Sequence, residues 1–200
     1  MNRNVSDINV PTGNKLKAAL DEEYGSDHTC FISCDVTSET QLKEAFRKTL
    51  ESFGRLDIVC NNAGIGNESN WERTVDINLV SLGPFLSAPV YTATKHAVVG
   101  FSRALADASR VSDYGVRINV LCPSFAKTEI LETFSTDDLM GQFSNLRQTT
   151  QKLMEHMGVL DPSQVAEHFL QLVTDDSRNG AVLMVTQAGA SYMEYPKSVM

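Results

Sequence analysis

The sequence has no excess of basic charge and no long apolar run. Its 17 Lys and Arg residues are outnumbered by 25 Asp and Glu, which gives a formal net charge of −8. That balance argues against a nucleic-acid or anionic-membrane surface, where clustered basic side chains would supply the affinity. No stretch reaches the roughly 20 apolar residues of a membrane span, and the polar start does not resemble a signal or transit peptide. We therefore expect a cytoplasmic protein with no nucleic-acid partner and no membrane partner.

Cysteine is also scarce, with four residues at positions 30, 34, 60 and 122. On an extended segment Cys30 and Cys34 would lie about 13 Å apart, which is too far for a disulfide bond. None of the cysteine spacings is typical of a zinc site. We expect reduced thiols and no bound metal.

The 200 residues suffice for one domain with its own core, and no repeat or linker divides them, so we predict a single domain over residues 1–200. Apolar runs rich in β-branched residues alternate with segments of helical periodicity. The expected strands are 29–36, 56–60, 116–121 and 181–185, and the expected helices are 38–53, 71–80, 91–110 and 162–173. This alternation indicates βαβ units and a mainly parallel sheet.

In such sheets ligands bind beyond the carboxyl ends of the strands. Three candidate segments follow expected strands: Asp35, the Asn61-Asn62-Ala63-Gly64 turn, and residues 122–128. Each has a simpler interpretation, respectively a helix-entry residue, a tight turn and an ordinary ordered loop. Only their occurrence together favours a binding site.

Tyr91 and Lys95 are four residues apart, so on a helix they share one face. Tyrosine is a poor base at neutral pH because its pKa is about 10, and a neighbouring ammonium group favours the phenolate. The pair could therefore act as a general base. Taken alone, the spacing is a common coincidence.

The motifs Asn61-Asn62-Ala63-Gly64, Tyr91-x-x-x-Lys95 and the Pro123 loop, in this order, resemble the short-chain dehydrogenase/reductase family. The resemblance runs from about Asp7 to near the C-terminus. Within the family the chain is most similar to the NAD-dependent 15-hydroxyprostaglandin dehydrogenases, through runs such as FGRLDIVCNNAG, VYTATKHAVVGFSRALA and GVRINVLCPSFAKTEIL. The resemblance implies a Rossmann-like, doubly wound parallel sheet.

The resemblance also implies roles for individual residues. Tyr91 would take the substrate's hydroxyl proton, Lys95 would hold the nicotinamide ribose, and Asn78 would steady a water beside Lys95. Asp7 would bind the adenosine ribose and select NAD over NADP, unless it lies in a frayed terminus. The full set implied to bind NAD is Asp7, Ile8, Cys34, Asp35, Val36, Asn62, Ala63, Gly64, Tyr91, Lys95, Pro123, Ala126, Lys127 and Thr128.

Two parts of the family pattern are missing. The Gly-rich turn that binds the pyrophosphate is absent, and we expect no strand before Thr12-Gly13. Gly64 and Tyr91 are only 27 positions apart, an interval that in the family holds a strand with the substrate-binding serine. Neither Ser81 nor Ser87 has that serine's spacing from Tyr91, and Ser124 replaces the glycine of the Pro-Gly loop.

The missing strands are central in a doubly wound sheet, so we expect an incomplete sheet, low stability and impaired activity. If the chain is active, the resemblance implies oxidation of the 15-hydroxyl of prostaglandins or related hydroxylated fatty acids to a ketone, by a homodimer. The apolar segment 128–160 would cover this small lipid substrate as a lid, although simple core packing also explains its apolar residues. The alternatives are an inactive truncated isoform that pairs with intact subunits, and a related dehydrogenase for another secondary alcohol.

Overall fold

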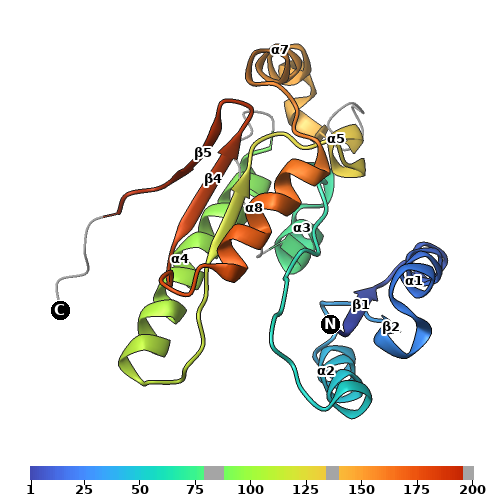
Figure 1. Ribbon diagram of the computed structural model, residues 1–200. Helices are drawn as coiled ribbons and strands as arrows, with labels where there is room; N and C mark the ends of the chain where they lie inside the picture. Colours follow the sequence, from blue (N-terminus) through green and yellow to red (C-terminus); the bar gives the residue numbers. More distant parts are fainter. Residues whose placement is uncertain (79–87, 134–139, 196–200) are drawn as a thin grey trace. The chain divides into compact units, whose positions relative to one another are not determined.

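A computed structural model describes residues 1–78, 88–133 and 140–195 of the chain. Their contacts divide the chain into two compact units, Met1–Ala63 and Gly64–Met200. In each unit parallel strands pair with one another and helices cover them (Figure 1). The expected α/β class and the incomplete sheet are confirmed, because the strands of the described residues form one pair and one group of three.

The N-terminal unit is a βαβα segment. Its elements are β1 (Arg3–Asp7), α1 (Val10–Tyr24), a 3-10 turn (Ser26–His28), β2 (Thr29–Ser33) and α2 (Glu39–Phe53). The strands are parallel, with Arg3 opposite Thr29 and Asp7 opposite Ser33. Both strands therefore end at the same edge.

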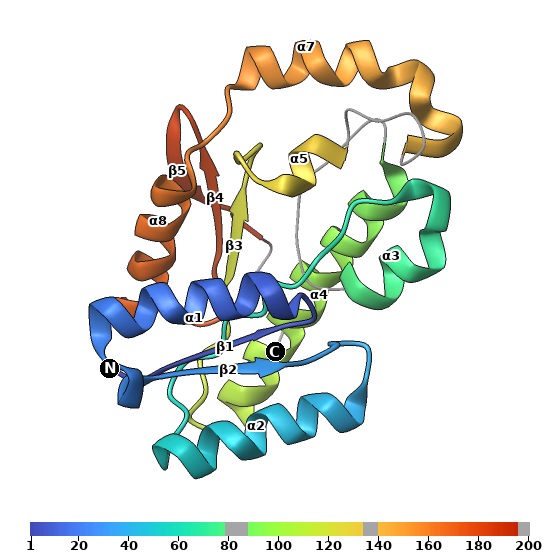
Figure 2. The ribbon, with the colours of Figure 1, turned by 90° about the vertical axis from the view of Figure 1, so that its right-hand side faces the viewer.

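Successive side chains on β2 point to opposite faces of this strand pair, as in every β-strand. Phe31 lies against α1, where a Cβ added to Gly13 would come within 2.0 Å of the ring. Ile32 packs with Cys34 and Ala45 on the side of α2. Figure 2 shows α1 and α2 on the two sides of the strands.

The helix α2 begins and ends where the sequence predicts. The Ser38 hydroxyl accepts a hydrogen bond from the Gln41 backbone N–H at 3.4 Å, and Gly54 ends the helix with a φ of 73°. The Gln41 side chain accepts from the Asp35 N–H at 2.9 Å instead of returning to Ser38. The helix entry is thereby tied to the end of β2.

The C-terminal unit holds the remaining elements. They are a 3-10 turn (Glu68–Asn70), α3 (Trp71–Asn78), α4 (Pro89–Val111), β3 (Val120–Pro123), α5 (Glu129–Thr133), a 3-10 helix (Gly141–Leu146), α7 (Arg147–Met157), α8 (Pro162–Thr174), β4 (Val182–Thr186) and β5 (Gly189–Tyr192). β3 and β4 are parallel, and β5 adds antiparallel to β4.

Two apolar clusters cover the faces of this sheet. Val99 of α4 packs with Val120 and Val182 on one face. Leu172 of α8 packs with Leu183 on the other. Each fully buried aliphatic side chain contributes about 1.5–3 kcal/mol, so α4 is held firmly along the sheet (Figure 1).

The expected strand 56–60 is wrong, since the structure has neither strand nor helix there. Its apolar side chains are exposed, with Leu56 at 40%, Ile58 at 38% and Val59 at 51%. Backbone N–H and C=O groups form a strand only beside a partner, and no strand among the described residues pairs with this segment. An apolar run is therefore not sufficient to predict a strand.

Other expectations need smaller corrections. A strand, β1, does precede Gly13, and the antiparallel β5 was not foreseen. The expected strand 116–121 begins at Val120, and the expected strand 29–36 ends at Ser33. The helix expected at 71–80 is confirmed to Asn78, and its last two residues lie outside the described part of the chain.

No helix in the described part of the chain is long and apolar enough to cross a membrane. Residues 1–78, 88–133 and 140–195 also contain no cluster of His, Cys, Asp and Glu that could hold a metal ion. All four cysteines are free thiols.

The contact between Gly13 and Phe31 gives a stability test. We expect Gly13→Ala to lower the free energy of unfolding by about 1–2 kcal/mol, because the added methyl group displaces the Phe31 ring. Gly100→Ala in α4 is the matched control, since nothing lies within 4 Å of its new Cβ and alanine favours a helix. Urea unfolding followed by circular dichroism measures both, and equal effects of the two substitutions would contradict the packing argument.

Candidate active site

The structure brings the predicted Tyr91–Lys95 pair together in the C-terminal unit. Pro89 is the first residue of α4, so Tyr91 lies in the first turn and Lys95 one turn later. Both side chains are buried, Lys95 completely. The Lys95 Nζ lies 4.4 Å from the centroid of the Tyr91 ring, in cation–π range.

Burial changes the acidity of this lysine. Removal from water disfavours the ammonium form and lowers the pKa of Lys95 to about 7. Near neutral pH this amine can therefore gain or lose a proton. A lysine in this state is typical of functional sites.

Gly64 closes one side of the Lys95 amine. A Cβ added to Gly64 would lie 3.3 Å from Asn78 Oδ1 and 3.7 Å from Lys95 Nζ. A Cβ at this position would crowd Asn78 Oδ1 and would be in van der Waals contact with Lys95 Nζ. The glycine predicted in the Asn-Asn-Ala-Gly motif thus has a local physical role.

Asn78 belongs to the same cluster and is fully buried at the end of α3. Its Oδ1 accepts the Ile65 N–H at 2.5 Å, and its Nδ2 donates to the Ile65 carbonyl. Both ends of the carboxamide are used to hold the backbone of one residue. Asn78 therefore positions the Gly64–Ile65 backbone beside Lys95.

In the N-terminal unit the residues predicted for the adenosine half meet at one edge of the strand pair. The Cys34 N–H donates to the Asp7 carbonyl at 3.1 Å, which joins the ends of β1 and β2. Asp7 is therefore at an ordered strand end, and its carboxylate accepts the Asn9 N–H at 2.7 Å. Ile8, Asp35 and Val36 continue from the same two ends.

The side chains at this edge differ in what they offer a ligand. The Asp35 carboxylate accepts from the Thr37 N–H at 2.9 Å and from its hydroxyl at 2.8 Å. Cys34 is buried, and desolvation raises the pKa of its thiol, with a further rise from the Asp35 charge. Cys34 therefore contributes packing, while Asp7 remains exposed to a ligand.

Asn62 and Ala63 are not built into the strand-end turn that the sequence predicts. They are exposed and lie in a stretch without helix or strand, because the expected strand before them does not form. Gly64 alone of this motif lies in the Lys95 cluster. The motif is divided between the two units, with Ala63 ending one and Gly64 beginning the other.

The loop after β3 is ordered by backbone hydrogen bonds. Leu160 N–H donates to the Phe125 carbonyl at 2.7 Å, and Lys127 N–H donates to the Leu160 carbonyl at 2.9 Å. Pro123 ends β3, and Ala126, Lys127 and Thr128 emerge at the carboxyl edge as predicted. Ser124 sits between them, and its buried hydroxyl has no hydrogen-bond partner in the described residues.

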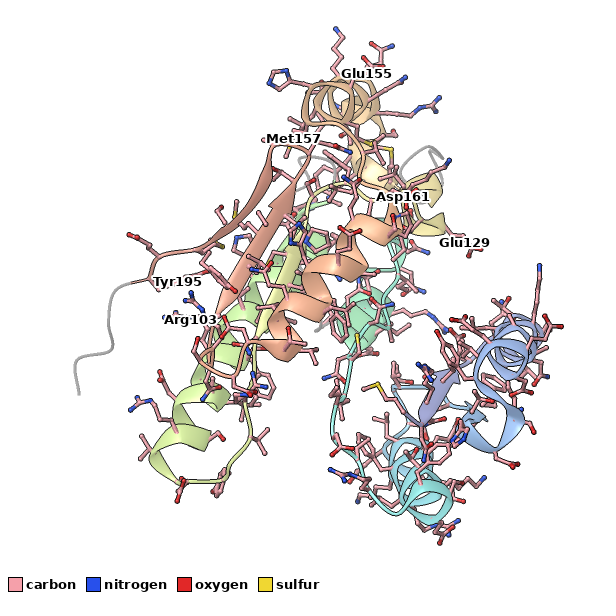
Figure 3. The ribbon with its side chains drawn as sticks, viewed as in Figure 1. Arg103, Glu129, Glu155, Met157, Asp161 and Tyr195 are labelled. Atoms are coloured by element: carbon pink, nitrogen blue, oxygen red, sulfur yellow. The ribbon has the colours of Figure 1, made fainter. Side chains whose placement is uncertain are left out.

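A cavity of about 350 Å³ lies beside this cluster. Its lining residues are Gly64, Ile65, Gly66, Asn67, Arg73, Glu129 and Ile130. Ile130 of α5 also packs against Ala88 and Tyr91, which joins the cavity wall to the Tyr91–Lys95 pair. Figure 3 shows the Glu129 side chain on α5.

Sequence reasoning missed Arg73 and Glu129. Neither belongs to a strand end, and they are brought together only by folding of residues 64–73 and 129–130 around one cavity. The one sequence feature that could have pointed to Arg73 and Glu129 is their closeness to the predicted site residues Gly64 and Thr128. Ser81 and Ser87 lie outside the described residues.

Comparison with known sequences agrees with these motifs. The family described as short chain dehydrogenase matches residues 2–84 and 81–139. The 15-hydroxyprostaglandin dehydrogenase (NAD(+)) of Rattus norvegicus is 40% identical over 221 residues, covering 94% of this chain and 83% of that protein. The Homo sapiens enzyme of the same name is 38% identical with the same two coverages.

Solved structures show the same fold at low identity. An NAD+-bound xylitol dehydrogenase superposes with a TM-score of 0.76 at 18% identity, over 92% of this chain and 87% of that one. A levodione reductase gives a TM-score of 0.77 at 22% identity, over 92% and 86%.

The alignment with the rat enzyme is longer than the part of this chain that it covers. The aligned span with the rat enzyme is 221 residues, whereas 94% of these 200 residues is only 188, so the alignment has gaps on this side. The two family matches meet at residues 81–84, in the short interval between Asn78 and Tyr91. The chain belongs to the short-chain dehydrogenase/reductase family.

Proposed function

We propose that this chain oxidises the 15-hydroxyl of prostaglandins or related hydroxylated fatty acids to a ketone, with NAD as the hydride acceptor. The buried Tyr91–Lys95 pair beside a cavity carries the proposal. The 40% identity to a 15-hydroxyprostaglandin dehydrogenase supports the choice of substrate.

Each unit, taken by itself, has residues that suit one part of NAD. In the N-terminal unit, Asp7 offers a carboxylate to the hydroxyls of the adenosine ribose and repels a 2′-phosphate. In the C-terminal unit, Lys95 is the residue that would hold the nicotinamide ribose, and Gly64 lies beside its amine. NAD, when bound, supplies the acceptor for the hydride.

The protein's part in the reaction is to move one proton and to orient the alcohol. Tyr91 takes the hydroxyl proton as the carbon–hydrogen bond breaks, so that a ketone and one proton leave together with the reduced cofactor. Lys95 lies against the Tyr91 ring, and its positive form favours the phenolate. Asn78 and Gly64 keep the backbone in place around Lys95.

Residues 128–160 form the lid over this site in our proposal. Ile130 contacts Ala88 and Tyr91. Gly141 lies close to Ser69, since a Cβ added to Gly141 would come within 3.1 Å of Ser69 Oγ. Two residues of the proposed lid thus lie close to the rest of the C-terminal unit, Ile130 at Ala88 and Tyr91 and Gly141 at Ser69.

A homodimer is the second part of the proposal, and its surface is on α4. Ala97, Phe101, Ala104, Leu105 and Ala108 are exposed at helical spacing, with Phe101 at 58% and Leu105 at 40%. Such a stripe of small and apolar residues suits close packing against the same helix of a second copy.

The second candidate function is an inactive relative that pairs with intact subunits. The observation that favours it is the exposed segment 56–60, which lacks the strand partners that its sequence requires. The same α4 stripe would serve this pairing. The two candidates differ in whether the chain itself reduces NAD.

Activity separates these candidates. We expect purified chain mixed with NAD+ and a 15-hydroxyprostaglandin to form NADH, and Tyr91→Phe to lower kcat/KM by about 10²–10⁴-fold because the proton acceptor is lost. Tyr114→Phe is the matched control, since Tyr114 is 70% exposed just beyond the far end of α4. If the wild-type chain forms no NADH and gives no heat with NAD+ in calorimetry, but co-purifies with a full-length relative, the inactive-partner function replaces the first.

The buried amine predicts a pH dependence of stability. The folded pKa of Lys95, about 7, lies below its ordinary value of 10.5, so the unfolded chain binds more protons between these pH values. Stability therefore rises with pH in this window, and below pH 7 the full cost of burying the ammonium remains. We expect Lys95→Met to be more stable than wild type at pH 6, by up to about 5 kcal/mol.

The measurement is the free energy of unfolding of the wild-type chain and of Lys95→Met across pH. Their difference in unfolding free energy should shrink from pH 7 to pH 9 as Lys95 loses its proton in the native state. Burial raises the pKa of Cys122 to about 12 and also raises the pKa of Cys34, but these thiols titrate in both proteins and cancel. A difference that stays constant with pH would show that Lys95 keeps its charge.

A further inference from the structure

The cavity beside Tyr91 has apolar and charged parts. Ile65 and Ile130 supply hydrocarbon, and the backbone of Gly64 and Gly66 allows close approach. Arg73 and Glu129 are the charged residues of the lining, and both are exposed. An apolar wall with a few polar groups is typical of a site for a small organic molecule.

The Arg73 side chain takes part in no interaction among the described residues that would stabilise the fold. Its guanidinium forms no ion pair or hydrogen bond with any residue in the described ranges; only its backbone N–H is used, by the Asn70 side chain at 3.2 Å. It lies in the first turn of α3, where the helix dipole disfavours a cation. A positive side chain and a helix N-terminus together create a local site for an anion.

Glu129 faces the same cavity from α5, also without an ion pair in the part of the chain that the structure describes. Its carboxylate is a hydrogen-bond acceptor only. A ligand that satisfies both groups carries an anion for Arg73 and a hydrogen-bond donor, such as a hydroxyl, for Glu129. The apolar wall requires that these groups be joined by hydrocarbon.

We infer that Arg73 binds the carboxylate of a free hydroxy fatty acid in this cavity, and that Glu129 accepts a hydrogen bond from a hydroxyl of the same molecule. The inference rests on the proposed function for the kind of lipid, and it adds that the free acid is preferred over its ester. The planar guanidinium group can donate two parallel hydrogen bonds to a carboxylate and pair with its negative charge. An ester has no negative charge and cannot form this ion pair.

Equilibrium binding tests this without catalysis. The probe is cis-parinaric acid, a fluorescent fatty acid, compared with its methyl ester on the full chain. We expect the acid to bind about tenfold more tightly than the ester, as a charged hydrogen-bonded pair requires. Arg73→Met should remove the preference, Arg73→Lys should restore part of it, and Arg110→Met, at the distant end of α4, should change neither affinity.

The hydroxyl contact is tested by displacement of the probe. A hydroxylated fatty acid should compete better than the same acid without its hydroxyl, and Glu129→Gln should reduce that advantage while leaving the preference for acid over ester. Equal binding of acid and ester by the wild-type chain, or a preference unchanged in Arg73→Met, would overturn the inference. An acid preference that depends on Arg73 in a chain that forms no NADH would support the inference and count against the proposed function.

Discussion

The complete burial of the Lys95 amine is the constraint around which the C-terminal unit is organised. An ammonium group removed from water is costly, and here the lowered pKa of Lys95 reduces that cost by allowing the neutral form. The groups around the amine leave little freedom: the Tyr91 ring lies on one side and the Gly64 backbone on another. Asn78 in turn fixes that backbone through Ile65. Sequence positions 64, 78, 91 and 95 therefore depend on one another.

How far the sequence predicts this arrangement depends on the range of the interactions. The proximity of Tyr91 and Lys95 on one helix and the limits of α2 were predicted correctly, because helical spacing and caps act within a few residues. The strand at 56–60 was wrong because a strand needs partners far away in the sequence. The cavity was missed for the same reason, since it forms only when residues 64–73 and 129–130 meet.

Segment 56–60 and the Lys95 cluster differ in the contacts that they need. Segment 56–60 needs partner strands, but no strand among the described residues pairs with it, and its apolar side chains are exposed. The contacts among Gly64, Asn78 and Lys95 form nevertheless, because they join α3, α4 and a short stretch of backbone without using a strand. The Lys95 cluster therefore does not depend on strand pairing by segment 56–60.

Recognition of an anionic lipid has to be reconciled with a net charge of −8. Charges farther than about 8 Å from a ligand are largely screened at physiological ionic strength, so the overall charge slows the approach of an anion more than it weakens its binding. Binding is decided by the nearest groups, which are the N-terminus of α3 and Arg73, whose guanidinium has no ion pair among the described residues. Glu129 opposes them within the same cavity, and this opposition makes a hydroxyl-bearing ligand fit better than a simple carboxylate. Selectivity thus comes from the arrangement of two opposite charges on an apolar wall, which neither composition nor net charge reveals.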